Sequence, residues 1–347
     1  MHRRKFLEAC AVSALAPPIF PWAAAAAHTA GDLSSQPVLR PTPEFPDNTS
    51  LAGPATAPAY PMSVMLWTVH TDLPFDQRLE KVAEAGYHAT QLVNEYKDWS
   101  NEDFARYRRK KESLGITFDA VSGINHSLCD PAQRPALLRE IQAHLNVMEQ
   151  LQSSRLILLS GNRIEGVSHA QTHADCVDTV KAVADLAAAK NVEILLENID
   201  PIENPNYFLT SITEIFQVAR EANHPNVKVL YDFFHEQIAE GNLIAKLQPN
   251  IDLIALVHVA DVPGRHEPGT GEINYANIFK KLHELNYRGN IAMEFMPTGD
   301  TVKSLKAAKA LASRCTGDSP TPCLSAARSR SGQSSNSHSI DFVAAAF

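Results

Sequence analysis

Residues His258 to Tyr275 read HVADVPGRHEPGTGEINY, and the rest of the chain is organised around this stretch. It follows the apolar run Ile251 to Val257, whose length and branched side chains are typical of a buried strand. It precedes a helical apolar pattern from Ile278 to Leu285. The stretch is therefore a strand end, a long polar loop and a helix start. Because functional residues concentrate on loops held by rigid strands, we expect this loop to line a functional site.

Strands and helices alternate on both sides of this loop. The apolar runs predict strands at 62–69, 88–93, 116–122, 155–160, 192–197, 227–232, 253–259 and 289–294. Helical spacing predicts helices at 75–83, 101–114, 132–151, 171–190, 211–222, 240–247, 274–286 and 301–313. Eight such units over about 250 residues predict an α/β fold, a closed parallel (β/α)8 TIM barrel. No G-x-G-x-x-G turn follows the first strand, which removes the main sign of a dinucleotide-binding fold.

Composition narrows the class of protein. With 347 residues, 44% of them hydrophobic, and a net charge of -8, the chain can bury one barrel-sized core. It has no basic excess that would favour nucleic acid, so we expect a small-molecule substrate. The five cysteines have no metal-site spacing and predict incidental thiols or at most one optional disulfide: Cys10, Cys129, Cys176, Cys315 and Cys323. The sequence is compatible with a homo-oligomer and does not decide the oligomeric state.

The ends of the chain differ from its middle. Arg3-Arg4-Lys5-Phe6-Leu7 is a twin-arginine pattern, and small residues follow at 23–27. Residues 1–27 are therefore expected to be a Tat signal peptide, and the mature protein to be periplasmic or extracytoplasmic. Residues 28–60 are expected to be a flexible linker, 61–314 the barrel and 315–347 a disordered low-complexity tail. We expect no membrane span, because no other apolar run approaches the ~20 residues that one needs.

Four polar residues interrupt apolar runs at the ends of the last four predicted strands. This strand-end cluster consists of Glu197, Asp232, His258 and Glu294. A buried charge is costly unless it is paired or ligates a metal, and the carboxyl ends of barrel strands are where such enzymes keep their chemistry. Three carboxylates and one imidazole suit Mg²⁺ or Mn²⁺ better than Zn²⁺.

The string ADVPGRHEPGTGEINY closely resembles the loop after strand seven in hydroxypyruvate isomerases, a branch of the xylose-isomerase-like barrel family. The resemblance extends from about Pro61 to Leu311. It implies that the strand-end cluster holds one divalent ion and that Glu197 and Glu294 act as acid and base. It also implies isomerisation of hydroxypyruvate to 2-hydroxy-3-oxopropanoate through an enediolate. His235, in the string DFFH, matches a family histidine that contacts substrate oxygen.

Five further residues are considered for contacts with the substrate or the site. Arg265 and His266 are candidates for holding a substrate carboxylate, because a guanidinium can grip it with two parallel hydrogen bonds. Glu267 and Glu272 are candidates for orienting them. Trp67, at the end of the first predicted strand, is expected to serve packing rather than substrate binding.

Two departures from the resembled branch keep other functions open. Hydroxypyruvate isomerases usually carry Gln where this chain has His258, whereas the ketose 3-epimerase branch carries His. Met296 stands where the isomerases tend to have Lys. The alternatives are an exported keto-sugar epimerase, isomerase or lyase with the same metal site, and a non-catalytic sugar-binding protein. An endonuclease ranks last, since it would need more histidine ligands and a basic face.

Overall fold

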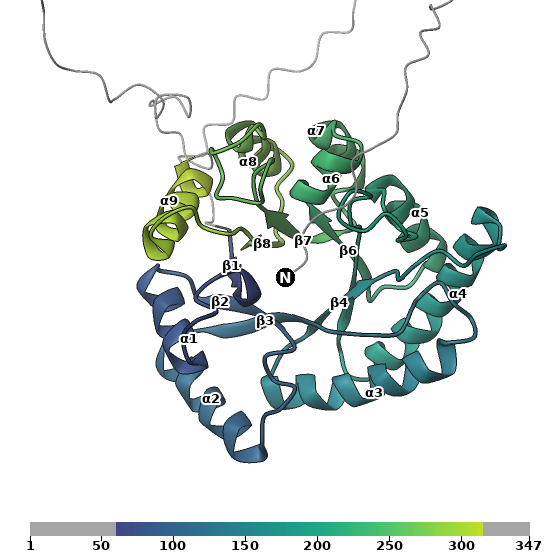
Figure 1. Ribbon diagram of the computed structural model, residues 1–347, viewed down its shortest axis with the longest axis horizontal. Coiled ribbons are helices and arrows are strands. Elements are labelled where there is room, and N and C mark those ends of the chain that lie inside the picture. Colours follow the sequence, from purple (N-terminus) through teal and green to yellow (C-terminus); the bar gives the residue numbers. More distant parts are fainter. Residues whose placement is uncertain (1–59, 315–347) are drawn as a thin grey trace, which may run out of the picture. The chain divides into compact units, whose positions relative to one another are not determined.

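The chain forms a closed parallel barrel in which eight strands follow one another in sequence order, as a computed structural model shows (Figure 1). The structure describes residues 60–314. The predicted (β/α)8 fold is confirmed. The predicted Tat signal, nearly all of the predicted linker and the predicted tail lie outside the described residues.

The strands are short and their pairing closes the ring. They are β1 Met62–Met65, β2 Ala89–Val93, β3 Thr117–Ser122, β4 Arg155–Leu159, β5 Glu193–Glu197, β6 Val227–Asp232, β7 Ile254–Val259 and β8 Asn290–Met293. Ser63 of β1 pairs with Ala89 on one side and with Ala292 on the other, which joins the first strand to the last.

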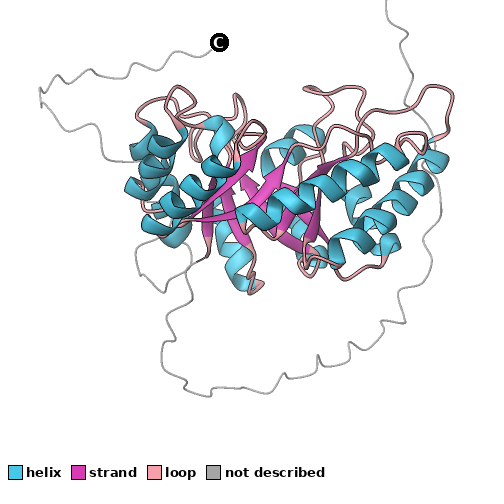
Figure 2. Ribbon diagram, turned by 90° about the horizontal axis from the view of Figure 1, so that it is seen from below, coloured by secondary structure: helices cyan, strands magenta, loops and turns pink. Residues whose placement is uncertain are grey.

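Helices surround the strands on the outside (Figure 2). They are α1 Phe75–Glu84, α2 Asn101–Ser113, α3 Arg134–Leu151, α4 His169–Ala188, α5 Ile212–Ala222, α6 Phe233–Ala239, α7 Leu243–Leu247, α8 Tyr275–Glu284 and α9 Thr301–Arg314. Short 3-10 helices cover Leu66–Thr68 and Gln248–Asn250. Within residues 60–314, none of these helices has the length and apolar character that crossing a bilayer requires.

Local structure differs from the sequence prediction at two strand ends. The first strand stops at Met65 instead of residue 69, because the chain turns there into the 3-10 helix Leu66–Thr68. Helix α6 was not predicted, since it begins directly after β6 without a turn residue. Asp232 caps helix α6, because its Oδ1 accepts hydrogen bonds from the N–H groups of Phe234 and His235 at 2.7 and 3.3 Å.

Cys129 and Cys176 are buried free thiols.

The barrel interior holds an apolar layer directly beneath the mouth. It consists of Met65, Ala120, Ile157, Leu195, Leu230, Leu256 and Ala292. Side chains along a strand alternate between its two faces, so a residue two positions further on points the same way. Each member of the strand-end cluster lies two positions after a residue of this layer. The cluster therefore sits on an apolar plug at the carboxyl end of the barrel.

Candidate active site and metal centre

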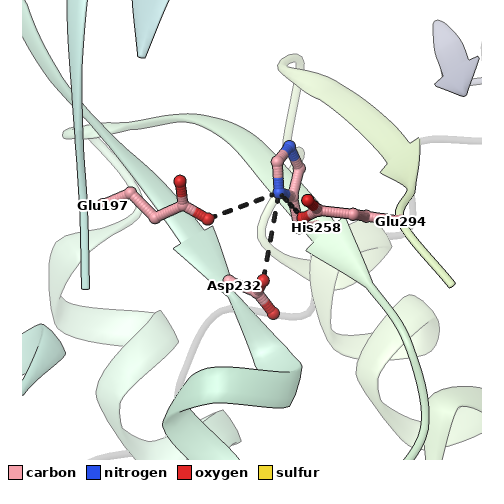
Figure 3. Close-up of side chains that lie close together, drawn as sticks. All are labelled: Glu197, Asp232, His258 and Glu294. Atoms are coloured by element: carbon pink, nitrogen blue, oxygen red, sulfur yellow. Dashed lines mark ion pairs between the residues drawn. The ribbon is translucent and has the colours of Figure 1, made fainter. Parts of the chain in front are cut away.

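The strand-end cluster converges on one point at the barrel mouth (Figure 3). One ligand atom from each of its four residues lies within 4.8 Å of all the others, and all four side chains are buried. His258 Nδ1 lies 3.5 Å from Glu197 Oε1 and 3.9 Å from Asp232 Oδ2, and it contacts Glu294 Oε2. The structure therefore brings together the four residues predicted as metal ligands.

Burial and mutual charge shift the protonation of this cluster. Burial is the main cause that raises the pKa of Glu197 above its ordinary value. Burial alone would also raise the pKa of Glu294, but the positive charges of Arg265 and His258 outweigh it and hold that pKa below its usual range. For His258 burial alone would lower the pKa, yet the carboxylates of Glu294 and Glu197 raise it to about 10. Positive charge at the centre of the cluster therefore stabilises its buried carboxylates.

The cluster fits a hard divalent cation. His258 Nδ1 and Glu294 Oε2 are both buried and form no hydrogen bond, although Oε2 forms ion pairs with Nδ1 and with Arg265 Nη2. The other ring nitrogen, Nε2, lies 2.8 Å from Gln91 Oε1. A metal-ligating histidine commonly donates its second N–H to such an acceptor, which directs the remaining lone pair at the cation. Three carboxylates with this nitrogen form a donor set suited to Mg²⁺ or Mn²⁺.

A polar network inside the barrel fixes the orientation of Gln91. Its amide Nε2 lies 3.3 Å from Ser63 Oγ and 3.5 Å from Asp119 Oδ2, so its oxygen faces His258. Asn290 Nδ2 also donates to Asp119, at 2.8 Å. The pairing register of β2 and β3 skips Asp119, and such a bulge re-aims a side chain. This network was not predicted from the sequence, although its members are polar residues within short apolar strands.

Replacing Gln91 with Leu should weaken metal binding about 10- to 100-fold, because His258 loses the acceptor that fixes its tautomer. The measurement is calorimetric titration of the metal-free protein with Mn²⁺. Thr90→Val is the matched control, since Thr90 is a buried polar residue of the same strand whose Oγ1 forms no hydrogen bond. Parental Mn²⁺ affinity in a folded Gln91→Leu variant would contradict this positioning role.

Arg265 lies inside the site rather than on its rim. Its Nη2 is 3.1 Å from Asp232 Oδ2 and 2.9 Å from Glu294 Oε2, and its Nη1 is 3.0 Å from His235 Nε2. Its φ of 57° is uncommon for a residue other than glycine. The guanidinium donors are thus directed at the protein's own groups. A role for Arg265 in holding a substrate carboxylate stays a prediction.

His235 and His266 take different places. His235 is buried beside the cluster, where its Nδ1 lies 2.7 Å from Asp200 Oδ2, so its Nε2 faces Arg265 and Asp232. His266 instead donates from Nδ1 to the carbonyl of Met296 at 2.8 Å, which ties the loop after β7 to the loop after β8. Of these two histidines, only His235 therefore lies beside the strand-end cluster.

The two loop glutamates do not orient these side chains. Glu267 accepts hydrogen bonds from Thr298 and Ser304, and Glu272 accepts one from Gln237 at 3.1 Å. Both therefore bind other segments, and their predicted contacts with Arg265 and His266 were wrong.

Trp67 is a site residue that the sequence analysis assigned to packing. Its indole N–H donates to Glu294 Oε1 at 2.7 Å, and its ring centre lies 5.6 Å from the guanidinium carbon of Arg265. The 3-10 helix at Leu66–Thr68 follows β1 directly, and β1 neighbours β8, so the indole reaches Glu294. The sequence predicted that the first strand continues to residue 69. A strand of that length gives no indication that the Trp67 ring contacts the site.

The family described as xylose isomerase-like TIM barrel matches residues 79–312. The chain belongs to this family. Membership in the xylose isomerase-like barrel family, to which the loop at His258 to Tyr275 pointed, is therefore confirmed.

Named relatives of this xylose isomerase-like barrel include two isomerases. The 2-oxo-tetronate isomerase of Haemophilus influenzae is 30% identical over 246 residues, which cover 69% of this chain and 95% of that protein. The hydroxypyruvate isomerase of Escherichia coli is 27% identical over 238 residues, covering 67% and 92%. Among solved structures, an AP endonuclease of family 2 from Brucella melitensis has a TM-score of 0.64 and 25% identity, covering 71% of this chain and 96% of that one. All three likenesses span nearly the whole of the relative.

Proposed function

We propose that this protein is a metal-dependent isomerase of small hydroxy-oxo acids that converts hydroxypyruvate to 2-hydroxy-3-oxopropanoate. The observation that carries the proposal is the pair Glu197 and Glu294, which approach His258 from opposite sides in a site that fits a cation (Figure 3). The relatives support the coarser statement that the chain is an isomerase. The more specific proposal, that hydroxypyruvate is the substrate, rests on this pair of glutamates and on the loop resemblance.

The reaction moves a carbonyl by one carbon. A proton leaves C3 of hydroxypyruvate, an enediolate forms, the hydroxyl proton passes from O3 to O2, and a proton is returned at C2. Two carboxylates on either side of the substrate can act as base and acid, and they exchange roles in the reverse direction. When bound, a divalent cation supplies the positive charge that stabilises developing negative charge on the substrate oxygens.

The two glutamates are not equally free to move a proton. Glu294 is held at both oxygens, with Trp67 at Oε1 and Arg265 at Oε2. Within residues 60–314, the one ion pair of Glu197 is with His258. We therefore assign the first proton transfer to Glu197 and the return of the proton to Glu294.

The alternative is an exported keto-sugar epimerase, isomerase or lyase that uses the same residues. His258 favours it, because a histidine at this position resembles the ketose 3-epimerase branch. Export by the proposed twin-arginine signal would also place the protein where free sugars occur. A sugar-binding protein without activity would not need both buried glutamates.

Solvent exchange in D₂O, followed by proton NMR, tests the proposal and its alternatives. The metal-loaded protein should remove the C3 proton signal of hydroxypyruvate and produce 2-hydroxy-3-oxopropanoate. Free ketoses should keep their signals. Exchange in a ketose alone would favour the alternative, and exchange in no compound would favour a binding protein.

A further inference from the structure

A hollow opens at the carboxyl ends of β3 and β4, beside the strand that carries Glu197. Its volume is about 440 Å³, and the residues that line this β3–β4 pocket include Asn125, His126, Leu159, Asn162, Arg163 and Tyr207. Leu159 is the pairing partner of Glu197 across β4 and β5, so the pocket begins one strand away from the proposed base. Burial, with the nearby charge of Glu197 as a second cause, raises the pKa of Tyr207, which is consistent with this closeness.

Arg163, a solvent-exposed residue, carries the unpaired charge of this pocket. Among residues 60–314, no side-chain or carbonyl group hydrogen-bonds or pairs with its guanidinium, whereas Arg265 is bound by Asp232 and Glu294. The backbone N–H of Arg163 donates to the carbonyl of Asn206 at 2.8 Å, which fixes the loop that carries it.

His126 and Asp130, which also line the pocket, are engaged within the protein. His126 Nδ1 lies 2.6 Å from Glu140 Oε2. Asp130 accepts at one oxygen from the N–H of Ala132 at 2.9 Å and at the other from Gln133 Nε2 at 2.8 Å. The pocket therefore presents one free guanidinium among fixed polar groups, which favours an anionic ligand over a neutral one.

We propose that the β3–β4 pocket binds the end of the substrate that carries the carboxylate, and that Arg163 holds this carboxylate. The proposal rests on the proposed isomerase function and names the residue that holds the carboxylate of its acid substrate. The volume lies within the ~300–1,000 Å³ typical of small-molecule sites and exceeds what a three-carbon acid requires. Hydroxy-oxo acids of four or more carbons, such as 2-oxo-tetronate, should therefore bind at least as well as hydroxypyruvate.

Steady-state kinetics of Arg163→Met and Arg163→Lys test this assignment. For hydroxypyruvate and 2-oxo-tetronate, Arg163→Met should raise KM about 10- to 100-fold, the range expected when a hydrogen bond to a charged group is lost. Its kcat should change little, and Arg163→Lys should recover part of the loss. Arg109→Met is the matched control, since Arg109 is exposed on helix α2 and its loss removes the same charge.

A binding measurement separates this proposal from the proposed function. D-glycerate carries the carboxylate and hydroxyls but no carbonyl, so it cannot be isomerised. Its Kd, measured by calorimetry, should rise for Arg163→Met and not for Arg109→Met. If the parent protein isomerises no acid but this difference persists, the pocket assignment stands and the isomerase proposal falls. If acids are isomerised but neither KM nor the glycerate Kd responds to Arg163→Met, the pocket assignment is overturned. A parent protein that neither isomerises an acid nor binds glycerate would overturn both.

Discussion

Replacing Glu197 with Gln is expected to lower kcat by about 10²- to 10⁴-fold while the barrel stays folded. Glutamine keeps the volume and one oxygen that can face the cation site, but it cannot accept the substrate proton. The loss should therefore fall mainly on kcat, measured by product formation from saturating hydroxypyruvate. Glu197 is the cleaner of the two targets, because Glu294→Gln would also disturb the contacts with Arg265 and Trp67.

Glu193→Gln is the matched control for this experiment. Glu193 opens the same strand, β5, at the opposite end of the barrel, where its partly exposed carboxylate pairs with Arg155 at 3.0 Å. Loss of an exposed pair costs ~0–1 kcal/mol of stability, so this variant should retain parental turnover. Parental turnover in Glu197→Gln itself would remove Glu197 from the mechanism and leave the Glu pair without a catalytic role.

The fold and the convergence of the strand-end cluster could be predicted because both follow from local periodicity. Glu197 ends a strand whose apolar residues are visible as a run of three letters, ILL, and Asp232 ends another in the same way. Parallel strands in a barrel present their carboxyl ends at one face, so polar residues at these ends must meet. No knowledge of long-range contacts was needed for this step.

The surroundings of the cluster could not be predicted, because they depend on contacts between residues far apart in sequence. Gln91 and His258 are separated by 167 positions, and Trp67 and Glu294 by 227. The turn of Arg265 into the site depends on a positive φ, which the sequence GR permits but does not require. Ion pairs across the barrel mouth fix the direction of its guanidinium, and the sequence does not show these pairs.

Removing divalent cations with a chelator is expected to abolish turnover, and Mn²⁺ or Mg²⁺ should restore it. The physical reason is the charge of the cluster, in which three buried carboxylates face one permanently charged cation, Arg265, while His258 is neutral as a ligand. Activity alone does not locate the ion, so thermal unfolding provides a second measurement. An ion that binds only the folded state stabilises it by about 2.7 kcal/mol when its concentration is a hundred times Kd, and Mn²⁺ should therefore raise Tm.

Asp232→Asn assigns that rise in Tm to the strand-end cluster. Asparagine retains the side-chain oxygen that caps helix α6 through the N–H groups of Phe234 and His235, but it removes one negative charge from the cation site. The metal-free variant should fold, and its Tm should respond to Mn²⁺ much less than that of the parent protein. An equal response would place the ion elsewhere in the chain. Full turnover after exhaustive chelation would show that the two glutamates move protons without a cation, and the charge argument for the site would then be wrong.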